Sequence, residues 1–225
     1  MDARDLVTQS QRIADPAAIA SVRRFFTGAD PLTTVMGVPI GKVFPVAKAF
    51  VGLSLTEIEA LLADTRYEVR MAAVAVMDFM ARTKGLPDAD RQALYALYLR
   101  RHDRINNWDL VDRAAPHVVG EYLRDKDRLV LDRLAQSQNP DERRTAIVAT
   151  YAFIRRGEVA DTFRIATILA GDHDAYVQKA VASWAREAGK RDPAALTAFL
   201  TACKSRLPRA TFSAAAKLLP QALYP

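Results

Sequence analysis

The sequence predicts an all-α protein, and three observations lead to this prediction. Helix start and stop signals recur from one end of the 225 residues to the other. Runs that alternate apolar and polar residues, as strands do, are missing at useful length. Alanine-rich segments repeat at a regular spacing. With 50% hydrophobic residues and only 9 glycines, the chain can bury a core as one large domain or two small ones.

Capping residues indicate where the helices begin. Ser54 and Glu57 stand at capping-box spacing ahead of an apolar run. Three more capping residues are each followed by proline at the first helical position, where the missing N–H has no partner to lose: Asp15, Asn139 and Asp192. Gly157 and Gly189 follow helical runs and are expected to end them. Pro116 is expected to begin a further helix.

A repeated pattern predicts how the helices are arranged. Ala72 and Ala146 occupy the same place in similar segments 74 residues apart, and Ala180 and Ala214 follow at steps of 34. Because 74 is about two units, residues 106–123 fall where a further unit belongs. Such a period is typical of paired helices stacked in HEAT-like repeats. We therefore expect a curved solenoid, an α-α superhelix, as a single domain over residues 1–225, with a helical extension at 1–20 and a cap at 207–225.

The charge of the chain favours a polyanionic partner. The net charge is +6 and the pI is near 9.6, and 24 of the 32 basic residues are arginine, which binds phosphate oxygens well. If the second helix of each unit lines the concave side, Arg70, Arg144 and Lys179 project from equivalent places and form a basic groove for a duplex. Two plainer explanations stay open: a GC-rich genome favours arginine, and helix ends carry basic residues for solubility.

Other functional classes are disfavoured. Cys203 is the only cysteine, so no disulfide framework is expected, and three histidines lack metal-ligand spacing: His102, His117 and His173. We expect no metal and no cofactor. No apolar run reaches the roughly 18 residues of a membrane span, and the amino terminus lacks an apolar signal core. We expect a cytoplasmic monomer that binds no membrane.

The segment NNWDLVDRAAPHVVGEYL, residues 106–123, places a tryptophan and two acids close together. Trp108 and Asp112 are four residues apart and share a helix face, while Asp109 turns away. Each residue also has a plainer role: a core position for Trp108, the helix amino terminus for Asp109, and an ion pair with Arg113 or Arg104 for Asp112.

Three segments carry a resemblance to a known family: INNWDLVDRAAPHVVGEYL, ERRTAIVATYAFIRRGE and YVQKAVASWAREAGKRDP. In this order and spacing they resemble the AlkD-type DNA alkylation repair glycosylases, a HEAT-like-repeat family. The resemblance extends over roughly Val22 to Pro208. It implies release of cationic N7- or N3-alkylated purines from double-stranded DNA, without swinging the base into a pocket, by a protein associated with the nucleoid. It also implies a catalytic set of three residues, in which Trp108 packs on the lesion's deoxyribose, Asp112 is the catalytic carboxylate and Arg144 lies at the DNA surface of the cleft.

The chemistry of these residue types agrees with the resemblance. A base alkylated at N7 already carries positive charge, so no acid is needed to protonate the leaving group. One carboxylate, Asp112, can stabilise the sugar cation and position a water, while the face of Trp108 attracts the same cation by roughly 0.5–2 kcal/mol. No lysine stands near Asp112 in the sequence, so no lyase step is expected. The candidate DNA-binding residues are Arg70, Arg143, Lys179 and Ser183.

The chain departs from the family pattern at two places. An ungapped comparison puts Ser183 where the family has a second aromatic, and Trp184 lies one residue on, about 100° round the helix. Asp141 stands where many relatives have an aromatic. Three functions are therefore open: a monofunctional glycosylase, a module of the same fold that binds damaged or branched DNA without cutting it, and a generic protein-binding solenoid.

Overall fold

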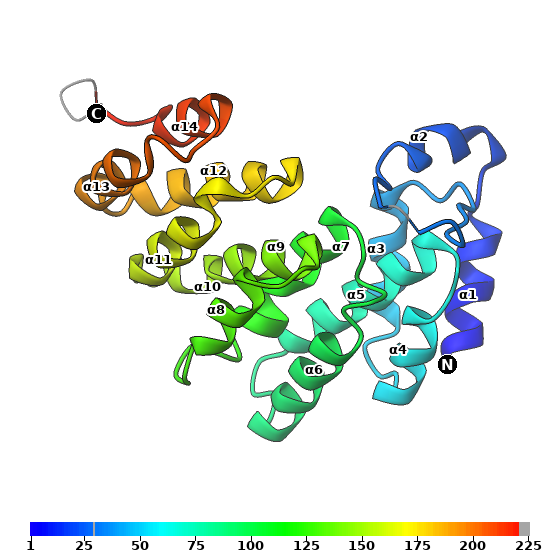
Figure 1. Ribbon diagram of the computed structural model, residues 1–225. Coiled ribbons are helices and arrows are strands. Elements are labelled where there is room, and N and C mark those ends of the chain that lie inside the picture. Colours follow the sequence, from blue (N-terminus) through cyan, green and yellow to red (C-terminus); the bar gives the residue numbers. More distant parts are fainter. Residues whose placement is uncertain (29, 221–225) are drawn as a thin grey trace. The chain divides into compact units, whose positions relative to one another are not determined.

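The computed structural model describes residues 1–28 and 30–220 (Figure 1). These residues form helices and turns, with an isolated β-bridge between Thr34 and Arg66. The expected all-α fold of paired helices is thereby confirmed. The chain divides into two compact units, Met1–Tyr122 and Leu123–Pro225, whereas the sequence led us to expect one domain over residues 1–225.

The first unit is built around α5. Its helices are α1 (Ala3–Arg12), α2 (Ile19–Arg23), α3 (Ile40–Ala49), α4 (Leu55–Leu62), α5 (Tyr67–Ala81), α6 (Asp88–Arg100) and α7 (Trp108–Ala114), with a 3-10 turn at Pro16–Ala18 and a π-helix at Ala115–Gly120. Helix α5 packs against α3, α4 and α7. Thirteen of its fifteen residues are buried, so its polar side chains point into the protein as well as its apolar ones.

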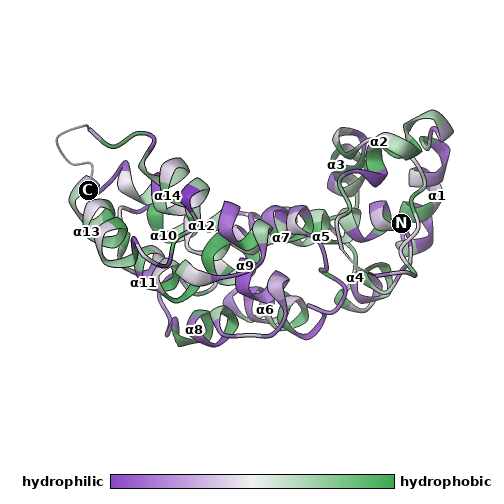
Figure 2. Cartoon of the chain, turned by 45° about the horizontal axis from the view of Figure 1, so that its top comes forward, coloured by the Kyte–Doolittle hydropathy of each residue, from purple (hydrophilic) through white to green (hydrophobic). Residues whose placement is uncertain are grey.

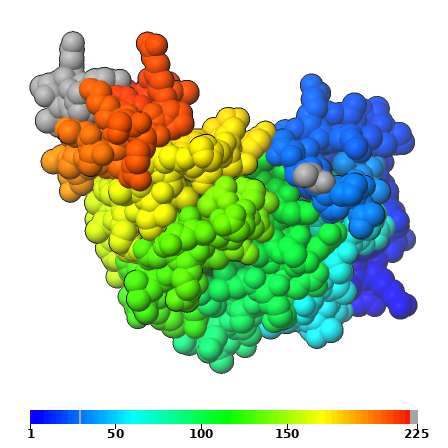
Figure 3. Space-filling model, viewed as in Figure 1, coloured from blue at the N-terminus to red at the C-terminus, as the bar shows by residue number. Residues whose placement is uncertain are grey.

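The second unit stacks helices in pairs. Its helices are α8 (Leu129–Ala135), α9 (Pro140–Ala149), α10 (Tyr151–Ile154), α11 (Ala160–Ile168), α12 (Ala175–Gly189), α13 (Pro193–Cys203) and α14 (Arg209–Ala216), with a 3-10 turn at Leu169–Gly171. Helix α8 packs on α9, α11 on α12, and α13 on α14, while α12 also contacts α9 and α14. Most helices carry both hydrophobic and hydrophilic residues (Figure 2), as amphipathic helices do. Helices α13 and α14 form the orange and red end of this unit (Figure 3).

The predicted repeat coincides with these pairs. Ala72, Ala146 and Ala180 lie in α5, α9 and α12, which are the second helices of their pairs, and at most 2% of each is exposed. Ala214 lies in α14 and is half-buried. A small side chain at this place lets α9 and α12 approach closely. The unit expected at 106–123 is present as α7, which follows α6.

The predicted helix boundaries are largely confirmed. Ser54 and Glu57 form both bonds of a capping box, and each of the other three capping side chains accepts a backbone N–H: Asp15, Asn139 and Asp192. Gly157 ends α10 with φ +83°, a conformation that favours glycine. Gly189 is the last residue of α12, and packing explains the glycine: a Cβ there would lie 2.3 Å from the side chain of Leu196.

The two ends of the chain pack on their own units. Residues 1–20 were expected to form an extension, but α1 contacts α3 and α4 and buries Leu6 completely. At the other end, α14 packs on α12 within the predicted cap. Residues 221–225 of that cap lie outside the described residues.

Other features of the described residues concern partners and cofactors. In the ranges 1–28 and 30–220, no helix is both long enough and apolar enough to cross a membrane. The same ranges contain no group of three or more His, Cys, Asp or Glu residues that could hold a metal ion. Cys203 is a buried free thiol.

Candidate functional site

Trp108 and Asp112 lie on one side of α7. The helix buries Leu110, Val111 and Ala114 against the first unit, whereas Trp108 and Asp112 are half-buried. At 100° per residue, positions 108 and 112 differ by about 40° and lie on the side away from the buried residues. The two side chains therefore lie on the same partly exposed side of the helix.

A loop from the amino-terminal part of the chain holds the Trp108 ring. The indole Nε1–H donates to the carbonyl of Phe25 at 3.2 Å. The Phe25 side chain is itself 47% exposed. Trp108 is thus not a core residue, and its ring is held by the backbone of a residue whose own side chain is exposed. No pattern in the sequence pointed to Phe25, because it stands 83 residues from Trp108.

Asn107 joins the same loop to α7. Only 2% of the residue is exposed. Its Oδ1 accepts the backbone N–H of Thr27 at 2.9 Å and the Thr27 hydroxyl at 3.1 Å. Its Nδ2 donates to the Phe25 carbonyl at 2.9 Å and to Asp109 Oδ1 at 2.5 Å. Three of the four bonds of this buried carboxamide therefore tie residues 25–27 to the start of α7, and the fourth binds Asp109 within the same helix.

Asp109 points into the protein and serves the interior. Its Oδ2 accepts a hydrogen bond from the hydroxyl of Tyr67, a fully buried residue of α5. Burial raises the pKa of Asp109, and the hydrogen bonds from Tyr67 and Asn107 oppose that rise. Burial also raises the pKa of Tyr67, and the nearby Asp109 carboxylate raises it further, so the phenol stays neutral. The separation of Asp109 from the Trp108 and Asp112 side is as expected.

Arg70 corrects the predicted basic groove. It was expected to project from the surface, but its exposed fraction is 0%. Its Nη1 donates to the carbonyls of Asp64 and Thr65 at 2.9 and 3.0 Å, and its Nη2 donates to Thr33 Oγ1 at 2.8 Å and to Asn106 Oδ1 at 3.4 Å. The expectation that Arg70 projects into a groove is wrong, because loops cover this side of α5 and bind its guanidinium group.

The guanidinium charge of Arg70 is buried, and burial disfavours the charged form. Burial lowers its pKa to about 10, and the nearby positive charge of Arg104 acts in the same direction. Asp30 and Asp64 oppose this effect. The guanidinium carbon also lies 5.8 Å from the centroid of the Phe26 ring. Arg70 therefore joins α5 to the loop that precedes the candidate site.

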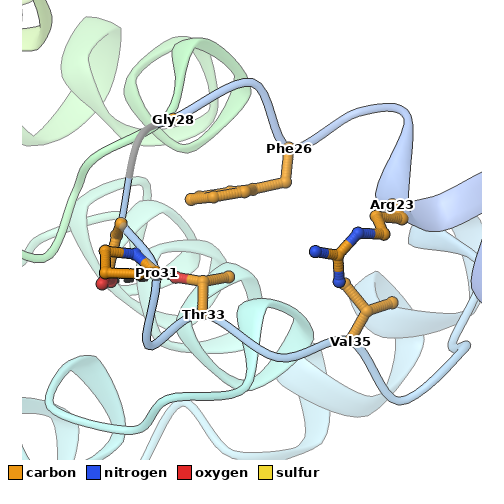
Figure 4. Close-up of a pocket in the computed structure, with 7 residues that line it drawn as sticks. Arg23, Phe26, Gly28, Pro31, Thr33 and Val35 are labelled. Atoms are coloured by element: carbon orange, nitrogen blue, oxygen red, sulfur yellow. Dashed lines mark hydrogen bonds between the residues drawn. The ribbon is translucent and has the colours of Figure 1, made fainter.

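A pocket opens beside this loop (Figure 4). Its volume is about 270 Å³, and it is lined by Arg23, Phe26, Gly28, Asp30, Pro31, Thr33 and Val35. The Phe26 ring lies along the pocket and the Arg23 side chain points toward it (Figure 4). Gly28 is required by close packing, since a Cβ there would lie 2.6 Å from the Asn106 carbonyl oxygen. The pocket thus adjoins the segment that leads into Trp108.

The arginines considered as partners of Asp112 each bind another acid. Arg113 Nη2 lies 2.7 Å from Asp78 Oδ2, and Arg104 Nη1 lies 3.2 Å from Asp30 Oδ2. The Asp78 carboxylate is 1% exposed and is also reached by His117 Nδ1 at 2.7 Å. Asp78 thus joins α5 to Arg113 of α7 and to His117 of the π-helix, while the Arg104–Asp30 pair lies before α7.

Pro116 differs from expectation. It does not begin a new helix, because α7 continues into the π-helix Ala115–Gly120. Proline lacks the N–H that an α-helix needs at this point, and a wider turn accommodates its ring. The π-helix therefore follows directly after the turn that carries Asp112.

In the second unit, the two predicted arginines are engaged by the protein. Arg143 Nε lies 2.6 Å from Asp172 Oδ2, and its Nη1 donates to the carbonyls of Ser137 and Gln138. Arg144 is 6% exposed, and its Nη1 donates to the carbonyl of Tyr176. The expectation that Arg144 projects freely from the surface is wrong, because its side chain joins α9 to the start of α12. Arg143 is a bridge to the loop before α12.

Helix α12 carries the exposed candidates. Lys179 is exposed, with its Nζ 4.5 Å from the centroid of the Tyr176 ring. Ser183 is exposed as well. Trp184 is half-buried, with its ring centroid 4.8 Å from that of Tyr151 in α10. Position 183 therefore faces outward, whereas the Trp184 ring packs against Tyr151.

Two comparisons with known proteins found a match. A family model described as "DNA alkylation repair enzyme" matches residues 7–219. Among solved structures, the chain is similar to a predicted DNA alkylation repair enzyme from Enterococcus faecalis, with a TM-score of 0.69 and 16% sequence identity. The similarity covers 92% of this chain and 97% of that one. At this identity it shows a shared fold. No curated protein is significantly similar to the chain.

Proposed function

The chain belongs to the DNA alkylation repair enzyme family, and from this premise we propose that it is a monofunctional DNA glycosylase. We propose as its substrate double-stranded DNA that carries cationic N7- or N3-alkylated purines, released without moving the base into a pocket. A cytoplasmic monomer that associates with the nucleoid is part of the same proposal. The observation that carries it is the common half-exposed side of α7, on which Trp108 and Asp112 lie together.

In the proposed reaction, Asp112 and Trp108 stabilise a sugar cation and need not protonate the leaving base. The bond between C1′ and the base nitrogen breaks, and its electron pair neutralises the positive charge of the base. The sugar is left as a cation, which the Asp112 carboxylate stabilises and the face of Trp108 attracts. A water then bonds to C1′ and gives up its proton to Asp112 or to solvent. The products are a free alkylated base and an abasic site.

Release of the base from damaged duplex DNA is the direct test. Duplex DNA methylated at random is incubated with the protein, and released 7-methylguanine and 3-methyladenine are measured by chromatography. Release above the spontaneous rate, together with abasic sites in the DNA, supports the proposal. Unmodified DNA and a heat-denatured sample of the protein are the controls. Tight binding to the damaged DNA with no release above the spontaneous rate excludes the glycosylase.

A serine at exposed position 183, where the resembled family has an aromatic residue, favours a second function. In this second function the protein binds damaged or branched DNA without cutting it. The residue lies on the surface of α12 at the place where the resembled family has a second aromatic. A protein that offers the sugar cation one aromatic face fewer attracts it less strongly. The base-release assay separates the two functions, because only a glycosylase leaves abasic sites.

We predict that binding to duplex DNA weakens as salt is added, because a chain of charge +6 neutralises phosphates. With about three to five phosphate contacts, the slope of log affinity against log salt is roughly −3 to −4.5. Fluorescence anisotropy with a labelled duplex measures this slope. Lys179→Glu should weaken binding more than Arg12→Glu, since Arg12 lies in α1 outside the predicted repeats. A slope near zero would remove DNA as the partner.

We predict that Ser183→Trp raises the rate of base release by about tenfold, because it adds a second face that attracts the sugar cation. The melting temperature should change little, since position 183 is exposed. Trp184→Ala is the contrasting variant, and it should lower the melting temperature because it removes the contact with Tyr151. If Ser183→Trp unfolds the protein and Trp184→Ala abolishes release in a folded one, Trp184 is the site residue.

A further inference from the structure

Asn107 occupies a capping position and does not act as a cap. It directly precedes α7 in extended conformation, with φ −152° and ψ 149°, and its side chain makes no capping hydrogen bond. Asparagine is among the residues that most favour capping. Here the carboxamide oxygen binds Thr27 instead, and the carboxamide nitrogen binds Phe25 and Asp109.

The network fixes the orientation of this carboxamide. Its oxygen meets two donors, the N–H and hydroxyl of Thr27, and its nitrogen meets two acceptors, the Phe25 carbonyl and the Asp109 carboxylate. Turning the amide by 180° would set donor against donor and acceptor against acceptor. All four of its hydrogen bonds stabilise one arrangement only.

The Phe25 carbonyl is shared by Asn107 and Trp108. It accepts from Asn107 Nδ2 at 2.9 Å and from Trp108 Nε1 at 3.2 Å. The carbonyl that orients the indole is thus held in place by the residue that precedes the indole. Gly28, which follows residues 25–27, also lies close to the Asn106 carbonyl, so the loop and the residues before α7 are in contact at a second point.

We propose that Asn107 is a positioning residue for Trp108. It fixes residues 25–27 so that the Phe25 carbonyl holds the indole in the orientation that faces the damaged nucleotide. Asp109 and Tyr67 support Asn107 from the interior. The expected effect on base release rests on the proposed glycosylase function. The expected effect on the orientation of Trp108 does not depend on that function.

The test follows the Trp108 ring directly. The chain has two tryptophans, so a Trp184→Phe background leaves Trp108 as the only one. In that background, Asn107→Ala is compared with Asn139→Ala. Asn139 also precedes a helix and is a true cap, since its side chain accepts from the Asp141 N–H, but it lies in the second unit. Both variants lose hydrogen bonds of an asparagine side chain, and only one of them concerns the Phe25 loop.

The expected results differ between the two variants. Asn107→Ala should raise acrylamide quenching of Trp108 fluorescence and lower its anisotropy, while Asn139→Ala should change neither. Single-turnover base release should fall by about tenfold or more in Asn107→Ala, since small misplacement of a site group is enough for such a loss. The Kd for duplex DNA should change by less than about twofold, since phosphate contacts dominate affinity.

Asn107→Asp adds a test by pH. The aspartate keeps the acceptor for Thr27 but places an oxygen against the Phe25 carbonyl and the Asp109 carboxylate. Protonation gives back one donor, so quenching and base release should return toward the wild-type values as the pH falls. Two other titratable groups lie close by: Asp109 is hydrogen-bonded to residue 107, and Tyr67 is hydrogen-bonded to Asp109. Asn107→Ala at the same pH values corrects for their titration.

The inference is overturned if Asn107→Ala folds and leaves the quenching and anisotropy of Trp108 unchanged. It is also overturned if quenching rises equally in Asn139→Ala, because the effect then reflects general loss of stability. Failure of the proposed function is a separate result. If the wild-type protein releases no base, the fluorescence arms still decide whether Asn107 orients Trp108.

Discussion

Asp112→Asn is expected to lower the release of 7-methylguanine by about 10²- to 10³-fold, the loss that follows removal of one preorganised electrostatic group. The substitution keeps the size of the side chain and removes its negative charge. The sugar cation then loses the carboxylate that stabilises it. Because the side chain is half-buried on α7 and Leu110, Val111 and Ala114 supply the buried side of the helix, the variant should fold normally. Single-turnover release and a thermal melt measure the two effects.

Asp109→Asn is the matched control for that experiment. It removes a carboxylate three residues away on the same helix, but this one accepts from Tyr67 and Asn107 inside the protein. An amide at position 109 can accept from only one of these donors with its oxygen, so the variant should lose stability and keep much more of its activity than Asp112→Asn. Equal losses of release in the two folded variants, or no loss in either, would show that the wrong carboxylate has been assigned.

The sequence was informative where local chemistry decides the structure. Capping at Ser54 depends on residues within one turn, and the buried alanines recur because each pair of helices packs in the same way. The common face of Trp108 and Asp112 follows from helix geometry alone. The order of the helices and the face of α7 could therefore be predicted without any tertiary contact.

The residues around that face could not be predicted in the same way. Phe25, Thr27 and Asn107 meet across about 80 residues of chain, and their hydrogen bonds depend on the path of a loop with no periodic pattern. The mistake at Arg70 has a related cause. Its place in the repeat predicts which side of α5 it occupies, but the loops that cover α5 turn that side into the interior. Arg144 shows the same effect in the second unit, where the start of α12 covers it.

Replacing the buried Arg70 is expected to lower the stability of the fold strongly. Arg70→Met keeps a long side chain and removes the charge and all four hydrogen bonds to Asp64, Thr65, Thr33 and Asn106. Buried carbonyl and hydroxyl groups are then left without their donor, and the nearby carboxylates of Asp30 and Asp64 lose a positive neighbour. Loss of such buried charged interactions costs about 3–5 kcal/mol of folding free energy.

For a protein of this length, that loss corresponds to a fall of about 6–20 °C in melting temperature. Arg12→Met, at an exposed position in the last turn of α1, should leave the melting temperature nearly unchanged. Below its own transition, Arg70→Met should keep the salt dependence of DNA binding, since a residue with no exposed surface neutralises no phosphate. A variant that melts like the wild type but loses about one unit of the salt slope would mean that Arg70 reaches DNA after all. The loop over α5 would then have to open when DNA binds.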